Sequence, residues 1–163
     1  MLFIHGAGGY SDDRPLAEAL AAELGVRLEM PELPDDDMSV AAWARPVREA
    51  LRHPGPAHVV AHSFGATILV HVLSSGVRPT PAALLAMPDW SPEGWDIDEY
   101  ALAPSSHLHL SLHHCRDDEV VPFSHLALNA RRLPSAVVHE HDRGGHQFDG
   151  RILALAQDLR RGR

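Results

Sequence analysis

The stretch Val59-Val60-Ala61-His62-Ser63-Phe64-Gly65 decides the fold. Residues 57–61 form a largely apolar run that predicts a buried strand, and Phe64 to Ser75 predicts an apolar helix that Gly76 closes. Ser63 therefore stands on a sharp strand-to-helix turn, with small residues on both sides that allow strand and helix to approach closely. The pattern predicts a nucleophile elbow, in which such a turn exposes a serine hydroxyl.

Other features of this stretch allow a second interpretation. Serine is also a favoured N-cap, so Ser63 can simply begin the helix that follows. Ala61 stands where the usual motif has glycine, a departure that adds one methyl group. His62 is next to Ser63, but on a sharp turn its side chain points elsewhere, and we expect it to be structural. The nucleophile interpretation therefore depends on a base, an acid and oxyanion donors from other parts of the chain.

A glycine-rich loop, His5-Gly6-Ala7-Gly8-Gly9, follows the apolar run at the start of the chain. A loop in this place can aim a backbone N–H at a substrate oxygen. We expect Ala7 to provide one oxyanion donor and Phe64 the other. The glycines at positions 6, 8 and 9 do not have the G-x-G-x-x-G spacing, so a dinucleotide site is not predicted.

Candidates for the acid and the base follow two later strand patterns. Asp117 and Asp118 come after the strand predicted at residues 108–113, and Gly144-Gly145-His146 comes after the strand predicted at 136–141. Ligands of parallel sheets bind at the carboxyl ends of the strands. The order serine, aspartate, histidine is that of the triads in one large hydrolase fold. We therefore predict His146 as the base; a surface-loop histidine is the alternative in a chain with 13 histidines.

The rest of the chain alternates between strand and helix patterns. Further strands are predicted at residues 1–5, 26–30 and 82–86, and helices at 12–24, 40–52, 123–133 and 150–161. Pro88 to Ser106 predicts a loop with a short helix. Such alternation is typical of a parallel sheet with right-handed crossovers and helices on both faces. We predict a single α/β domain over residues 1–163, a three-layer α/β/α sandwich with about six parallel strands.

Taken together, these motifs resemble the α/β-hydrolase superfamily over nearly the whole chain. Within it, the chain is similar to the small serine hydrolases of the YdeN and retinoblastoma-binding-protein-9 type. The resemblance implies that the acid is Asp118, which stands four residues before Pro122 in an Asp-x-x-Val-Pro pattern. It also implies a minimal fold that lacks the first two strands of larger relatives and has little or no cap.

Composition limits the classes of function. Fourteen Lys and Arg against 22 Asp and Glu give a net charge of −8, which disfavours nucleic acid and anionic lipid as partners. No apolar run approaches the roughly 20 residues that span a membrane, and the first residues do not have the pattern of a signal peptide. We expect a cytoplasmic protein that acts on a small molecule, with no nucleic-acid or membrane partner. Protein partners stay open.

Several histidines and a cysteine suggest other chemistry. His107/His109 and His139/His141 are i, i+2 pairs, each on one face of a predicted strand, an arrangement that can bind a metal. Because neither pair has a third ligand at useful spacing, we predict no metal site, and we predict no cofactor. Cys115, the only cysteine, is expected to be a small buried residue rather than a nucleophile.

The substrate side of the site depends on Trp90, Trp95 and Tyr100. These rings either form an apolar wall over the nucleophile or anchor an irregular loop on the core, and both interpretations stay open. We predict a serine hydrolase, a carboxylesterase, that cleaves ester-like bonds through an acyl-enzyme formed on Ser63. The alternatives are hydrolysis of thioesters or amides, and a non-enzymatic ligand-sensing or protein-interaction module that keeps the fold.

Overall fold

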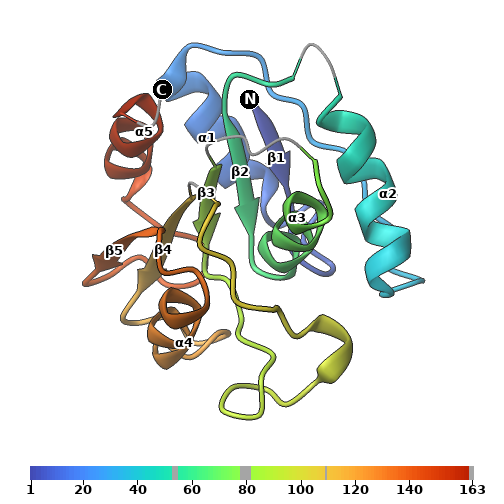
Figure 1. The fold of residues 1–163 in the computed structure, drawn as a ribbon. Helices are drawn as coiled ribbons and strands as arrows, with labels where there is room; N and C mark the ends of the chain where they lie inside the picture. Colours follow the sequence, from blue (N-terminus) through green and yellow to red (C-terminus); the bar gives the residue numbers. More distant parts are fainter. Residues whose placement is uncertain (53–54, 78–81, 109, 162–163) are drawn as a thin grey trace.

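The computed structural model describes residues 1–52, 55–77, 82–108 and 110–161 (Figure 1). Within these residues, five parallel strands form one sheet whose order follows the sequence. The strands are β1 (Leu2–Ile4), β2 (Val59–His62), β3 (Ala82–Leu85), β4 (Leu110–Cys115) and β5 (Val137–His141). The predicted parallel α/β architecture is confirmed, with five strands in the described residues instead of about six.

The strand predicted at residues 26–30 is reduced to a single bridge. Glu29 pairs with Leu2 in parallel orientation, since its N–H donates to the Met1 carbonyl and its own carbonyl accepts from the Phe3 N–H, both at 2.8 Å. Pro31, two residues further on, has no N–H with which to continue a ladder. The pairing next to β1 therefore does not extend into a strand.

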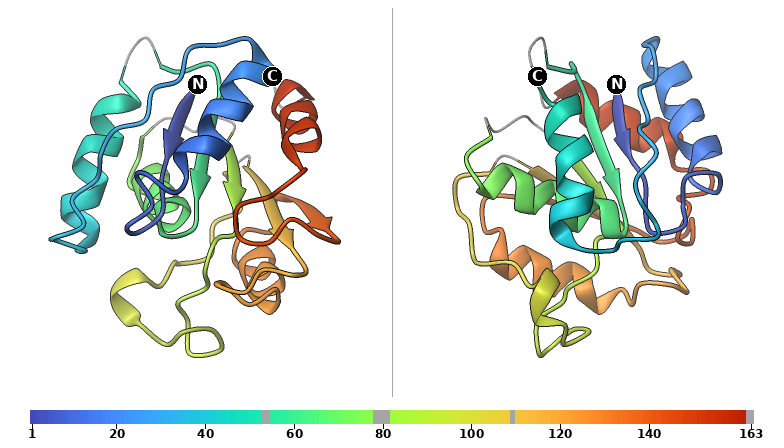
Figure 2. Two further views of the ribbon diagram at one scale, coloured as in Figure 1. Left: turned by 180° about the vertical axis from the view of Figure 1, so that it is seen from behind. Right: turned by 90° about the vertical axis from the view of Figure 1, so that its right-hand side faces the viewer.

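Helices cover both faces of the sheet. The helices α1 (Arg14–Leu24) and α5 (Ile152–Arg161) pack against each other on one face. On the other face lie α2 (Val40–Ala50), α3 (Phe64–Ser74) and α4 (Ser124–Arg132). The right-hand view of Figure 2 shows α1 and α2 on opposite sides of the strands. This is the predicted three-layer sandwich.

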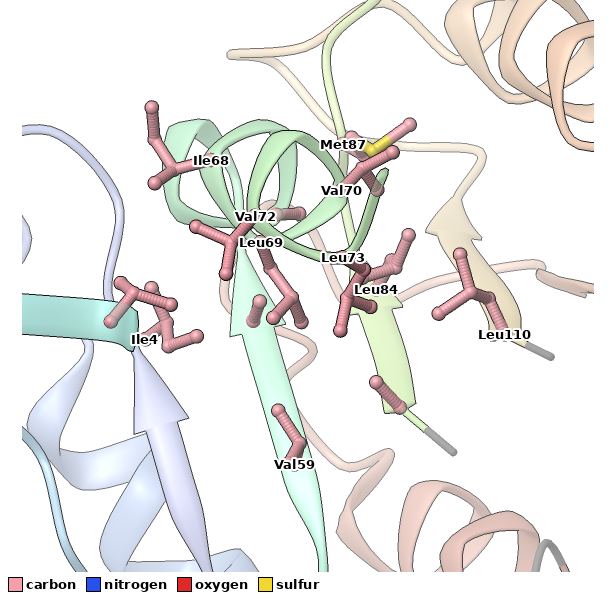
Figure 3. Packing of buried hydrophobic residues seen from close by; sticks show 14 of the residues in the cluster. Ile4, Val59, Ile68, Leu69, Val70, Val72, Leu73, Leu84, Met87 and Leu110 are labelled. Atoms are coloured by element: carbon pink, nitrogen blue, oxygen red, sulfur yellow. The ribbon is translucent and has the colours of Figure 1, made fainter. Parts of the chain in front are cut away.

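Nearly all of α3 is buried in the larger of the two hydrophobic clusters. Leu69 and Leu73 point from α3 toward Val59 and Leu84 on the strands beneath it (Figure 3). Full burial of one such side chain contributes about 1.5 to 3 kcal/mol. A helix packed in this way fixes the position of the turn that precedes it, and that turn carries Ser63.

The loops that follow the strands meet at the carboxyl edge of the sheet. Beyond the carboxyl ends of β2 and β3, the segment 88–106 forms an irregular extension with a single turn of 3-10 helix, η1 (Asp98–Tyr100) (Figure 1). This matches the predicted loop with a short helix. Of the helices in the described part of the chain, none has both the length and the apolar character that crossing a membrane requires.

Candidate active site

Ser63 lies on a strained turn between β2 and α3. Its backbone has φ 51° and ψ −125°, a region in which residues other than glycine are uncommon. The Ser63 N–H donates to the carbonyl oxygen of Leu85 at 2.8 Å. A Cβ atom on Gly65 would lie 2.2 Å from the His5 carbonyl oxygen, so this close approach requires glycine. Among the described residues, no amide of α3 caps onto the Ser63 side chain, which argues against the helix-cap interpretation.

His146 and Asp118 pair between the loops that follow β5 and β4. The Nδ1 atom of His146 lies 2.9 Å from Oδ2 and 3.1 Å from Oδ1 of Asp118. The Asp118 side chain is fully buried, whereas that of His146 is 15% exposed. A proton on Nδ1, donated to Asp118, leaves Nε2 as the nitrogen that can accept a proton. Because His146 and Ser63 line the same cleft, the structure brings the three predicted triad residues into one region.

The surroundings of Asp118 keep its carboxylate charged. Burial by itself raises the pKa of Asp118, but hydrogen bonds from His114, His146 and the Val121 amide outweigh burial and hold the pKa well below its usual value. Oδ1 accepts from the amides of Val120 and Val121, each at 2.9 Å, and Oδ2 lies 3.3 Å from Nε2 of His114. A charged carboxylate at Nδ1 stabilises the imidazolium that forms when a base accepts a proton.

Asp117, the other candidate acid, supports the loop that leads to His146. Its Oδ1 accepts from the Gly145 N–H at 2.8 Å, and its Oδ2 from the Gly144 N–H at 3.3 Å. Gly144 has φ 142°, and a Cβ atom there would lie 2.9 Å from the Cys115 sulfur, so only glycine fits. Of the two adjacent aspartates, Asp118 therefore contacts the imidazole and Asp117 contacts the backbone before it.

The glycine-rich loop after β1 reaches the same cleft. The amides on either side of Ala7 hold the loop in shape through hydrogen bonds of 2.8 to 2.9 Å: Gly6 to Asp13, Gly8 to Asp35, and Gly9 to the Gly6 carbonyl. Ala7, Ser63 and Phe64 all line the cleft. The two residues predicted to supply the oxyanion donors, Ala7 and Phe64, therefore line the surface that a bound substrate would meet.

A buried pair, Asp13 and His62, connects this loop with the loop of His146. One oxygen of Asp13, Oδ2, lies 2.8 Å from both the Gly6 N–H and Nδ1 of His62; the other, Oδ1, accepts from Nε2 of Gln147 at 2.9 Å. Nε2 of His62 lies 2.9 Å from the His146 carbonyl oxygen. The two ring nitrogens of His62 thus link the Asp13 carboxylate to the backbone of His146. The sequence analysis missed Asp13 as part of the site.

The aromatic residues of segment 88–106 form one cluster above α3. The Trp90 ring lies 5.8 Å from that of Phe64 and 4.8 Å from that of Tyr100, and its Nε1 donates to the Thr67 hydroxyl at 2.8 Å. Trp95 packs edge-on against Trp90 at 4.9 Å and is 38% exposed. Trp90 therefore anchors the loop on the core, while both tryptophans also face the cleft.

The cleft beside Ser63 has a volume of about 480 Å³. Its lining includes the polar residues Asp12, Asp13, His62, Ser63, His146 and Gln147. Its apolar lining consists of Met38, Phe64, Pro88, Trp90, Trp95, Tyr100 and Val120. A concave, mostly apolar surface with a few convergent polar groups is typical of a small-molecule site.

The other residues singled out in the sequence lie away from this cleft or are not placed. His109 is outside the described residues, so the pair His107/His109 cannot be assessed. His139 and His141 lie on β5, on the face covered by α5, and neither lines the cleft. Cys115 is completely buried, and burial raises its pKa to about 12, so the sulfur stays a protonated thiol and a poor nucleophile.

Comparisons with known proteins concern the family and the fold of the chain. A family model described as serine hydrolase matches residues 1–149. A search of curated proteins finds no match. Among solved structures, the ydeN gene product from B. subtilis is similar, with a TM-score of 0.75 and 21% identity over 99% of this chain and 96% of that chain.

Two further solved structures share the fold. Alpha/beta hydrolase domain-containing protein 10 from mouse has a TM-score of 0.75 at 15% identity, covering 98% of this chain and 87% of that one. The esterase domain of a Rhodothermus marinus protein has a TM-score of 0.67 at 13% identity, covering 98% and 85%. At these identities the structures establish a common fold, and the family match adds the chemical class.

Proposed function

Because the chain belongs to the serine hydrolase family, we propose that it hydrolyses ester-like bonds of small molecules with Ser63 as nucleophile, His146 as base and Asp118 as the supporting acid. The observation that carries the proposal is the buried Asp118 carboxylate on Nδ1 of His146, in a cleft that also contains the strained turn of Ser63. These contacts and the shared cleft support the three proposed roles.

In the proposed first half-reaction, Nε2 of His146 takes the proton of the Ser63 hydroxyl as Oγ attacks the substrate carbonyl carbon. The carbonyl π electrons move to the oxygen, and the amides of Ala7 and Phe64 stabilise the resulting oxyanion. As the oxyanion collapses, the bond to the alcohol oxygen breaks, and His146 passes its proton to the departing alcohol.

In the second half-reaction, water takes the place of the alcohol. His146 removes a proton from the water as its oxygen attacks the acyl-enzyme, and it returns that proton to Ser63 Oγ as the acyl group leaves as a carboxylic acid. Throughout, Asp118 holds the proton on Nδ1 and stabilises the imidazolium. The proposed reaction consumes water and needs no cofactor or metal.

The test is hydrolysis of p-nitrophenyl acetate by the wild type and by Ser63→Ala. The variant should lose nearly all turnover, since loss of a nucleophile typically costs many powers of ten, while its melting curve stays that of a folded protein. Ser74→Ala, an exposed serine on α3, is the matched control and should retain full activity. Retention of more than a few per cent of activity by Ser63→Ala would show that another residue is the nucleophile.

A further inference from the structure

A second cluster of polar side chains lies where β4, β5 and α5 meet. His113 on β4 is the direct ladder partner of His139 on β5, and their rings stack with centroids 4.4 Å apart. Asp158 of α5 faces both: Oδ2 lies 3.1 Å from Nε2 of His113, and Oδ1 lies 3.1 Å from Nε2 of His139. The ligand atoms of the three residues all lie within 4.8 Å of one another. None of these residues lines the cleft of Ser63.

His113 is held in the orientation that a metal ligand needs. It is buried, its Nε2 lies 3.1 Å from both Asp158 Oδ2 and Ser111 Oγ, and its Nδ1 lies 3.2 Å from Nε2 of His141. If Nε2 binds an ion, the ring proton occupies Nδ1, where His141 can accept it. A hydrogen bond from the second ring nitrogen is the usual way in which proteins orient a histidine ligand.

His139 presents a nitrogen without a well-aligned partner. Its Nε2 is buried and, within the described residues, makes no hydrogen bond of acceptable geometry, although Asp158 is 3.1 Å away. Buried polar atoms normally have a partner, so this nitrogen is an exception that calls for an explanation. A cation between the three side chains would give His139 that partner.

We propose that His113, His139 and Asp158 bind a divalent transition-metal ion, with zinc as the first candidate. Two imidazole nitrogens and one carboxylate oxygen are donors that Zn²⁺ accepts, and three protein ligands plus a water complete its tetrahedral shell. The water can enter because the side chains of His139 and Asp158 are 31% and 20% exposed. The sequence patterns suggested no metal because the third ligand comes from a helix that only the fold brings to β4 and β5.

Binding requires a small rearrangement of one ring. The two imidazoles are parallel to within 4°, and an ion cannot lie in both ring planes at once. His139 is on the edge strand of the sheet and partly exposed, so its ring can tilt out of the stack, while buried His113 keeps its place. The bound ion would join α5 to β4 and β5, and α5 begins just after the loop that carries His146.

The experiment is a zinc titration of the full chain after dialysis against a chelator. Calorimetry measures the binding, and the melting temperature is recorded at each zinc concentration. We expect one zinc per chain and a melting temperature that rises with zinc concentration, because a ligand of the native state stabilises it. His139→Ala, which removes a partly exposed ring, should weaken zinc binding at least tenfold and abolish the rise.

Two control variants separate this site from other histidines. His107→Ala removes an exposed histidine elsewhere, and His146→Ala removes the imidazole in the cleft; both should bind zinc as the wild type does. Asp158→Asn should weaken zinc binding as much as His139→Ala does. With Co²⁺ in place of zinc, the wild type should show the absorption bands of a tetrahedral site, whereas His139→Ala and Asp158→Asn should not. The proposal is overturned if His139→Ala and Asp158→Asn bind zinc like the wild type, or if the wild type binds none.

Discussion

Replacing Asp13 by asparagine should lower both the stability of the fold and the turnover of esters, although Asp13 has no role in the proposed reaction steps. Its two oxygens accept hydrogen bonds from the Gly6 amide, His62 and the Gln147 side chain. Asparagine keeps one oxygen and replaces the other by an NH₂ group, which must face at least one of these donors. It also leaves the buried His62 ring without its anionic partner.

The cost follows from the environment of the carboxylate. Burial raises the pKa of Asp13, but hydrogen bonds from His62, Gly6 and Gln147 outweigh burial and lower the pKa from 3.8 to about 2. A difference of this size corresponds to roughly 2 kcal/mol of preference for the charged form. Leaving a buried hydrogen-bond donor without an acceptor typically costs about 1 to 3 kcal/mol, and Asp13 accepts from three such donors. We expect a loss of about 3 kcal/mol, equivalent to a fall in Tm of about 6 to 12 °C for a chain of this length.

The assay is denaturant and thermal unfolding of Asp13→Asn beside Asp12→Asn, which makes the same change of charge at an exposed neighbouring position. Asp12→Asn should change the free energy of unfolding by less than about 0.5 kcal/mol. Ester turnover at 25 °C should also fall in Asp13→Asn, because Gly6 and the His146 loop lose a common anchor. Equal stability of the two variants would refute the argument that Asp13 holds the site together.

The remaining predictions concern the acid, the substrate and pH. Asp118→Asn should lower kcat by about 10⁴-fold, because an amide favours the wrong imidazole tautomer, while Asp117→Asn should cost less than about tenfold; kinetics giving the reverse order would make Asp117 the acid. For p-nitrophenyl esters from acetate to palmitate, kcat/KM should peak within the first few carbons, since each methylene contributes about 0.8 kcal/mol only where it is buried; a steady rise beyond about eight carbons would reveal an acyl channel. Asp13 has a folded-state pKa of about 2, lowered from 3.8, so its stabilisation is complete above the unfolded-state value and is lost as pH falls from about 4 to 2. The free energy of unfolding should therefore change less between about pH 4 and 2 for Asp13→Asn than for the wild type. An equal change in both proteins would contradict the stabilising role of the Asp13 carboxylate.

The sequence predicts the framework of the site because its main signals are local. Ser63 stands between an apolar strand and an apolar helix, and His146 follows two glycines after a strand, so each can be placed from its neighbours alone. Of the adjacent aspartates, the resemblance to the α/β-hydrolases implies Asp118, and the structure places this residue against the imidazole. The catalytic roles of these residues are still predictions that the variants above will test.

Features made by distant contacts cannot be predicted in this way. Asp13 follows Asp12 in a polar stretch before a helix, and nothing local shows that its carboxylate is buried against His62, 49 residues away in the chain. The structure also explains the glycine at position 9, because a Cβ atom there would lie 2.7 Å from Asp13 Oδ2. The strand expected at residues 26–30 fails for a similar reason, since its alternating pattern does not show how far its pairing with β1 extends.

The central claim is that Ser63 is an activated nucleophile, and covalent labelling tests it most directly. The wild type, Ser63→Ala and His146→Ala would each be incubated with a fluorophosphonate, and the adduct would be located by peptide mass spectrometry. We predict one adduct per wild-type chain, on Ser63, with no adduct on Ser63→Ala and much slower labelling of His146→Ala, because the hydroxyl needs its base. An adduct on another residue, or no labelling of the wild type, would contradict the proposed function.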